Sequence, residues 1–272
     1  MAAAIRRTRF RSPLVRGSYE ELLSFLHYYR HFGTPTIIGG WAVYFYNPYY
    51  GSVDIDVVGP SFRGSFYEVI ERYERSHGYA IIPNEPFGIE VVASKPLYRG
   101  KKKIGEMEID ACSYGQNSAS LFHEDETKHL PYSLCGREDH RREAVIAKDR
   151  ICYVPSRALL TLFKVKARRD RSFDISARGA TMNPSRLEWL RAKVVKDGSD
   201  IIALLDDKNR RGRELLNDQL DFAQMKRIAS AHEITDLVRE TLQEVLKDNS
   251  AFSLYNRYVE RKALLQSVEA LD

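Results

Sequence analysis

The chain has 272 residues, which is enough for one large domain or two modest ones. A hydrophobic fraction of 43% and a charged fraction of 29% exclude an intrinsically disordered chain. The net charge of +5 fits a phosphate-bearing partner without requiring one.

The chain carries no sign of a membrane or a secreted protein. No run approaches the about 20 apolar residues of a membrane span, and the basic N-terminus has no apolar leader core. The three cysteines, Cys112, Cys135 and Cys152, match neither a disulfide framework nor zinc-ligand spacing. We therefore expect reduced thiols and a cytoplasmic location. A set of N-terminal arginines could contact nucleic acid, although a solvated arm is the simpler expectation. They are Arg6, Arg7, Arg9, Arg11 and Arg16.

The first half of the chain alternates helical and strand patterns. Apolar residues recur at helical spacing after Ser18, and a short β-branched run from Thr36 leads into Gly39 and Gly40. The predicted helices cover 18–30, 41–46 and 66–75, and the predicted strands cover 36–38, 53–58, 80–82, 90–93 and 104–114. This order predicts an α/β (α+β) fold with a mixed sheet.

After Pro155 the pattern becomes helical. The predicted helices cover 156–170, 185–206, 212–229, 233–247 and 251–270. The charged stretch 136–150 is typical of a linker, so we place a domain boundary near Ile151. We expect an α/β domain over 1–150 and an all-helical domain over 151–272, with the substrate cleft between them.

Acidic residues on two predicted strands, with a preceding glycine pair, carry the chemical signal. Asp54 and Asp56 lie two residues apart, so they share one face of a strand, and Asp110 lies on a later strand. Neighbouring carboxylates of this kind bind hard divalent cations. Gly39 and Gly40 would let backbone amides approach phosphate oxygens. Each feature alone is common: glycine pairs form ordinary turns, and Asp-x-Asp often decorates an exposed strand.

The run from Ile38 to Ala42, followed by Ser52 to Asp56, resembles the signature of the nucleotidyltransferase superfamily. The glycine pair and the helical second half are most similar to AbiEii-type abortive-infection nucleotidyltransferases, which include toxins that modify transfer RNA. The resemblance implies a metal-dependent transfer of a nucleoside monophosphate from a nucleoside triphosphate. It implies Mg²⁺ or Mn²⁺ on Asp54, Asp56 and Asp110, with Asp110 also acting as base. Gly39, Gly40 and Ser52 would contact the triphosphate.

The helical half extends the resemblance. Lys164 and Arg171 match a family helix that carries a lysine and an arginine, and Lys196 and Asp200 match a later Lys-Asp pattern. The resemblance implies that all four contact the nucleotide, with Lys164 offsetting phosphate charge. The stretch 172–193 is a departure and resembles an insertion. A solvated helix face is the alternative for the basic run 164–171.

The acceptor is open. The net charge, the arginine-rich start and the resemblance favour RNA, at a transfer-RNA 3′ end. The resemblance also implies a possible toxin with an antitoxin protein partner. A small molecule or a protein are alternative acceptors, and a catalytically silent nucleotide- or RNA-binding module is a rival of another class. The aromatic residues of 41–46 are expected to be core, with Tyr49 and Tyr50 as possible exceptions that stack a base. Lys101, Lys102 and Lys103 are expected at a solvated loop tip.

Overall fold

The computed structural model describes residues 10, 12–60, 65–82, 91–115, 118–207, 215–257 and 259–269. Its described part forms two compact units. The first unit draws on Met1–Ala119, Pro131–Ser156 and Glu214–Leu216, and the second on Ser120–Leu130, Arg157–Arg213 and Asn217–Asp272. The N-terminal arginines 6, 7, 9 and 11, Glu90 and residues 212–214 lie outside the described residues. Arg16 lies inside a helix and donates a hydrogen bond to the carbonyl of Phe10.

A mixed seven-stranded sheet forms the centre of the first unit, in the order β3-β4-β5-β2-β1-β9-β8. Two neighbouring pairs, β2 with β5 and β1 with β9, are parallel, and the other pairs are antiparallel. The expected mixed sheet is present. The strands are β1 (Thr36–Ile37), β2 (Ile55–Gly59), β3 (Ala80–Ile82), β4 (Val91–Arg99), β5 (Lys102–Ser113), β8 (Arg141–Ala147) and β9 (Arg150–Pro155).

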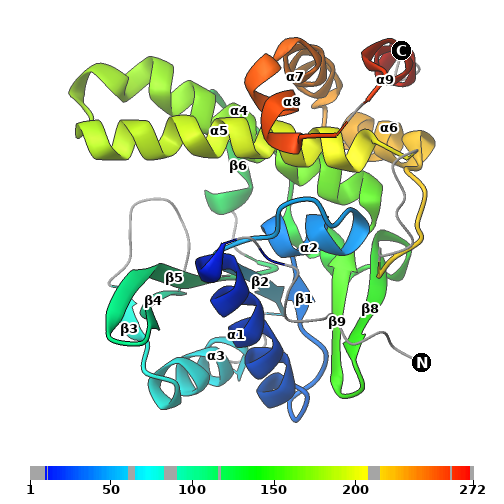
Figure 1. Ribbon diagram of the computed structural model, residues 1–272. Helices are drawn as coiled ribbons and strands as arrows, with labels where there is room; N and C mark the ends of the chain where they lie inside the picture. The colour runs from blue at the N-terminus through cyan, green and yellow to red at the C-terminus, as the bar shows by residue number, and fades with distance from the viewer. Residues whose placement is uncertain are drawn as a thin grey trace. The chain divides into compact units, whose positions relative to one another are not determined.

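Three helices accompany this sheet: α1 (Pro13–Tyr29), α2 (Gly39–Tyr46) and α3 (Ser65–Ser76). Helix α1 starts earlier than its periodicity predicts, because the Ser12 hydroxyl caps the amide of Val15 and Pro13 suits a first helical turn. Helices α1 and α3 lie together against the sheet (Figure 1). Short 3₁₀ turns at Ser118–Ser120, Tyr132–Gly136 and Glu138–His140 complete the described elements around these strands.

The core of the first unit is rich in aromatic side chains. Helix α2 buries Trp41, Tyr44, Phe45 and Tyr46, as its aromatic run predicts. The Trp41 indole donates a hydrogen bond to the buried Ser18 hydroxyl across 3.1 Å. Phe10 also contacts the Trp41 ring edge-on. These aromatic residues are therefore packing groups, whereas Tyr50 is 47% exposed.

The stretch 136–150 is not a linker. Seven of its residues form β8, an edge strand in which Ala144 and Ile146 are buried while Glu143 and Val145 are exposed. The alternation is short and follows the charged residues Arg141 and Arg142, so in sequence the stretch resembles a charged loop. Strand β9 then continues the same sheet, so the sheet extends to Pro155, beyond the expected boundary at 150.

The second unit is mostly helical. A two-stranded hairpin of β6 (Leu121–Phe122) and β7 (Asp125–His129) joins it from earlier in the chain, so the unit is not all-helical. Its long helices, α4 (Arg157–Arg178) and α5 (Pro184–Leu205), run side by side (Figure 1). A 3₁₀ turn, Gly179–Thr181, follows α4. The remaining helices are α6 (Phe222–Ala231), α7 (Thr235–Lys247), α8 (Asn249–Tyr255) and α9 (Arg261–Glu269).

The helix predicted over 251–270 is two helices. Asn256 adopts a left-handed conformation, with φ of +51°, directly after α8. Asparagine tolerates this conformation and commonly ends a helix there. Among the described residues, no helix combines the length and apolar character that crossing a membrane requires.

Candidate functional site

The glycine pair brings the backbone against two predicted site residues. Gly39 has φ of +64°, and a Cβ placed on it would overlap the Asp56 carboxylate. A Cβ on Gly40 would lie 2.7 Å from the Ser52 hydroxyl oxygen. Only glycine allows both approaches, because any side chain would displace the oxygen beside it. The start of α2, Asp56 and Ser52 therefore form one tight cluster.

Strand β2 positions Asp56 within this cluster. The amide of Ile38 donates to the carbonyl of Asp56 across 3.0 Å, which holds the glycine turn beside the strand. Ile55 and Val57 are buried on the opposite face, as strand alternation requires. Asp54 lies just before the strand, which starts at Ile55 rather than at the predicted position 53.

Asp110 is the direct neighbour of Asp56. Strands β2 and β5 are parallel, and their register pairs Asp56 with Asp110. Residues paired in this way project to the same face of a sheet from strands about 5 Å apart. The flanking pair, Ile55 with Ile109, is fully buried and anchors the register. The structure therefore brings together two of the three predicted acids, with Asp54 two residues before Asp56.

The donor set fits a hard cation in part. Carboxylate oxygens are the ligands that Mg²⁺ and Mn²⁺ prefer, and Asp56 and Asp110 lie on one face. However, no group of three or more His, Cys, Asp or Glu side chains in the described part of the chain converges closely enough to hold a metal ion. In this arrangement a cation would be held by the Asp56–Asp110 pair, and Asp54 would have to turn toward it.

Four predicted site residues of the second unit share one buried ion-pair cluster. Lys164 Nζ lies 3.1 Å from Asp197 Oδ1 and 2.9 Å from Asp200 Oδ2. Lys196 Nζ lies 2.5 Å from the other Asp200 oxygen, and Arg171 pairs with the other Asp197 oxygen. Both carboxylates are almost completely buried. We call Lys164, Arg171, Lys196, Asp197 and Asp200 the α4–α5 charge cluster.

The stretch 172–193 explains how the cluster forms. It contains the end of α4, the turn at Gly179–Thr181 and the start of α5. It is thus the closed end of a helical hairpin rather than a separate insertion between distant segments. Pairing of the two helices returns Lys196 and Asp200 to Lys164 and Arg171. The stretch 172–193 therefore brings the candidate residues of α5 beside those of α4.

Burial and oppositely charged neighbours shift the pKa values of Asp197 and Lys196 in opposite directions. Burial alone raises the pKa of Asp197, but the adjacent Arg171 and Lys164 hold it below its usual value. Burial, together with Lys164, lowers the pKa of Lys196, although Asp200 acts in the other direction. The pairs keep Asp197 ionised, whereas burial and the neighbouring Lys164 make Lys196 a weaker base than a surface lysine.

The rest of the basic run on α4 makes structural pairs. Lys166 Nζ lies 2.5 Å from Asp170, and Arg168 lies 3.0 Å from Asp248. Arg169 pairs with Glu240 across 2.9 Å and also with Glu124. These side chains are not a solvated basic face. Arg168 and Arg169 attach α4 to neighbouring parts of its own unit, whereas the Lys166–Asp170 pair lies within α4.

Sequence reasoning missed two sets of polar residues. His123 Nδ1 lies 3.1 Å from the Asp174 carboxylate, and the His123 amide donates to Asp170. The contact joins the β6–β7 turn to α4, and no sequence spacing could have indicated it. Asp197 was also not predicted as a site residue, although it follows Lys196 directly and shares two cations in the cluster.

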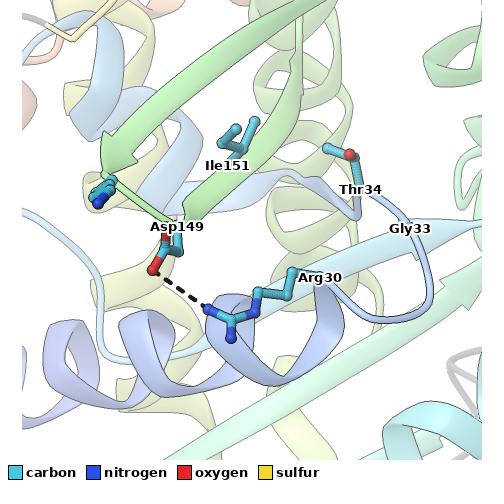
Figure 2. A pocket seen from close by; sticks show the side chains of 6 residues that line it. Arg30, Gly33, Thr34, Asp149 and Ile151 are labelled. Carbon is cyan, nitrogen blue, oxygen red and sulfur yellow. Dashed lines mark ion pairs between the residues drawn. The ribbon is translucent and has the colours of Figure 1, made fainter.

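A surface hollow of about 500 Å³ lies elsewhere on the first unit and contains none of the predicted site residues. Arg30, Gly33, Thr34, Lys148, Asp149 and Ile151 line it (Figure 2). Arg30 and Asp149 form an ion pair of 3.5 Å across it, and both side chains are more than a third exposed. Exposed pairs of this kind are held weakly, so we assign the hollow no chemical role.

Similarity to known proteins is found among solved structures. No protein-family model matches the chain, and no curated protein matches it. One solved structure, described as an antigenic nucleotidyltransferase-like protein from Paracoccidioides brasiliensis, is similar with a TM-score of 0.48 and 14% sequence identity. The similarity covers 94% of this chain and 100% of that chain.

Proposed function

We propose that the chain is a metal-dependent nucleotidyltransferase that moves a nucleoside monophosphate from a nucleoside triphosphate to an acceptor hydroxyl. The observation that carries the proposal is the cluster of Gly39, Asp56 and Asp110. A backbone turn without a side chain lies against one carboxylate, and a second carboxylate lies beside it in strand register. Such a turn exposes amides to phosphate oxygens next to a cation-binding pair.

The proposed reaction is an in-line displacement. The acceptor hydroxyl oxygen forms a bond to the α-phosphorus, the bond from that phosphorus to the bridging oxygen breaks, and pyrophosphate leaves. Asp110 accepts the hydroxyl proton. A bound Mg²⁺ or Mn²⁺ ion, held by Asp54, Asp56 and Asp110, would neutralise phosphate charge. The amides of Gly39 and Gly40 and the Ser52 hydroxyl would orient the triphosphate.

The α4–α5 charge cluster supports a nucleotide role with one condition. Three cations, Lys164, Arg171 and Lys196, contact the two carboxylates of Asp197 and Asp200. A phosphate or ribose group could be bound only if at least one existing pair opens. We assign Lys164 the phosphate contact and Asp200 the role of holding Lys164 and Lys196.

We propose RNA as the acceptor, at a transfer-RNA 3′ end, and a cytoplasmic location. The net charge of +5 supports a nucleic-acid partner. Three free cysteines, all buried, fit a reducing compartment. A toxin role with an antitoxin protein would follow from the AbiEii resemblance.

The test of transfer uses purified protein, each radiolabelled triphosphate, Mg²⁺ and total RNA. The Asp54→Ala/Asp56→Ala variant is the negative control. The Asp139→Ala/Asp149→Ala variant removes two surface carboxylates of the same unit and controls for net charge. Label on RNA with the wild type and surface variant, but not with the Asp54/Asp56 variant, supports the proposal.

Three other outcomes would reject the enzyme, the RNA acceptor or the toxin role. Triphosphate binding without transfer to RNA, small molecules or protein would identify a silent binding module and sink the enzyme proposal. Transfer to a protein or small molecule would retain the reaction and reject RNA. The toxin role is tested separately: induced expression should arrest growth, and Asp56→Ala should relieve the arrest. Arrest that persists with Asp56→Ala would reject a toxin that acts by transfer.

A further inference from the structure

The closed end of the α4–α5 hairpin presents an aromatic and basic surface. The chain has two tryptophans. Trp41 is fully buried, whereas Trp189 on α5 is 41% exposed. Single exposed aromatic side chains are common, so exposure alone assigns Trp189 no role. The groups beside its ring distinguish Trp189.

Two cations lie over the exposed ring. Arg186 Cζ lies 4.2 Å from the centre of the Trp189 ring, and Lys193 Nζ lies 5.1 Å from it. The three residues are spaced at i, i+3 and i+7, so they line one face of α5. The neighbouring Leu190 is buried, which directs the tryptophan away from the helix packing. An aromatic platform bordered by cations results.

The charged side chains near this platform are mostly positive. Residues 178–193 contain four basic side chains and one acidic side chain, Glu188. The basic side chains are Arg178, Arg186, Arg191 and Lys193. The local start of α5 is well defined, because the Asn183 side chain caps the Ser185 amide across 2.9 Å and Pro184 occupies the first turn. The platform is thus carried on a rigid helix.

We propose that this surface binds single-stranded RNA through Trp189, Arg186 and Lys193. A base stacks on the indole and displaces one cation from the ring, and that cation then contacts the adjacent phosphate. Stacking on aromatic side chains is available to every base, and cations beside the ring follow the backbone. An acidic peptide would meet the same cations but would have no planar group for the indole. The pairing of ring and charge favours RNA.

This inference rests on the proposed function for its biological sense, since it assigns the acceptor class to a surface of the second unit. It does not depend on the transfer chemistry. The binding experiment therefore needs neither a triphosphate nor a metal ion. Failure of binding and failure of transfer give separate results.

The experiment measures anisotropy of fluorescein-labelled oligouridylate and oligoadenylate with the full chain, over a series of salt concentrations. Trp189→Ala should weaken binding about tenfold or more, and Trp189→Phe should restore most of it. Arg186→Gln/Lys193→Gln should lower the slope of log affinity against log salt by about 0.7, the value for the one phosphate contact that is lost. Lys226→Gln/Arg227→Gln on α6 loses the same charge and should change the affinity less than twofold, about the scatter expected of a surface change.

Tryptophan fluorescence supplies an independent reading. RNA should quench the emission of the wild type but not that of Trp189→Phe, in which only the buried Trp41 remains. Thermal unfolding of each variant checks that the helices are intact. Equal RNA affinity of Trp189→Ala and wild type would overturn the inference, and so would equal competition by polyglutamate or duplex RNA. Transfer to RNA that persists unchanged in Trp189→Ala would leave the proposed function standing and reject this surface as the acceptor site.

Discussion

Gly39 lies so close to Asp56 that a Cβ at position 39 would overlap the Asp56 carboxylate. The first turn of α2 and the acid on β2 are thus packed without an intervening side chain. Any substitution at Gly39 must move the carboxylate, the turn or both. This relationship links a backbone requirement directly to the candidate metal pair.

We expect Gly39→Ala to abolish transfer and to lower the free energy of unfolding by more than about 1–3 kcal/mol, the cost of a strained φ alone. Gly100→Ala separates the two causes, because Gly100 has the same φ of +64° and nothing within 4 Å of its added Cβ. Urea unfolding and the transfer assay measure both variants. Equal loss of stability in the two would show that Asp56 tolerates the added methyl group.

Asp200 holds two lysines in the α4–α5 charge cluster and is fully buried. Asp200→Asn removes a buried carboxylate that Lys164 and Lys196 share, so it should lower the free energy of unfolding by about 3–5 kcal/mol. Asp236→Asn is the control, since Asp236 pairs with Arg239 on the surface and its side chain is 83% exposed. It should cost about 0–1 kcal/mol. Similar urea midpoints for both variants would contradict a buried cluster.

Glu74 predicts a pH-dependent stability. It is fully buried, and neither carboxylate oxygen has a hydrogen-bond partner among the described residues. Burial, with a smaller effect of Glu71, raises its pKa from 4.5 to about 7. Between these values the folded state binds more protons than the unfolded state, so the free energy of unfolding falls as the pH rises.

The free energy of unfolding should fall by about 3 kcal/mol between about pH 4 and about pH 8 because of Glu74. Glu74→Gln should remove this part of the pH dependence and stabilise the protein most at alkaline pH. Glu68→Gln, at an exposed position of the same helix, should leave the dependence in place. Parallel pH profiles for wild type and Glu74→Gln would show that Glu74 is ionised throughout.

Arg157 closes the end of α5. Its guanidinium donates to the carbonyls of Leu204 at 2.6 Å, Asp206 at 3.1 Å and Asp218 at 3.2 Å. Carbonyls at the end of a helix lack partners within that helix, so one arginine satisfies several groups. Arg157→Lys keeps the charge but loses the planar fork, and should destabilise by about 3 kcal/mol. Arg227→Lys, exposed on α6, should be neutral in the same thermal unfolding measurement. A neutral Arg157→Lys would show that charge alone suffices.

Much of the site's local geometry follows from sequence. Strand alternation predicts Asp56 opposite Ile55 and Val57, and the glycine pair predicts a turn ahead of a short helix. The structure has both features. Periodicity also predicts the position of α5 closely, because its apolar residues repeat over many turns.

Edge strands and caps were harder to predict. Strand β8 resembles a linker in sequence because it begins with three charged residues and buries only Ala144 and Ile146. Helix α1 begins five residues before its predicted start, at Pro13 rather than Ser18, because a cap and a proline extend it beyond the apolar repeat. A short strand and a helix cap each involve only a few residues, so the repeat of apolar residues over a longer stretch does not reveal them.

By itself, the sequence determined the α/β first half, the mostly helical second half, and which carboxylates and cations were candidates. The two halves and the candidate carboxylates of β2 depend on residue spacing within single elements, whereas the candidate cations follow from the family resemblance. Tertiary structure alone decided that Asp110 pairs with Asp56, and that Asp197 and Asp200 share the cations of α4. Strand register and helix pairing bring together residues that are far apart in the chain. The burial of many other side chains determines both the register and the pairing. No local pattern contains that information.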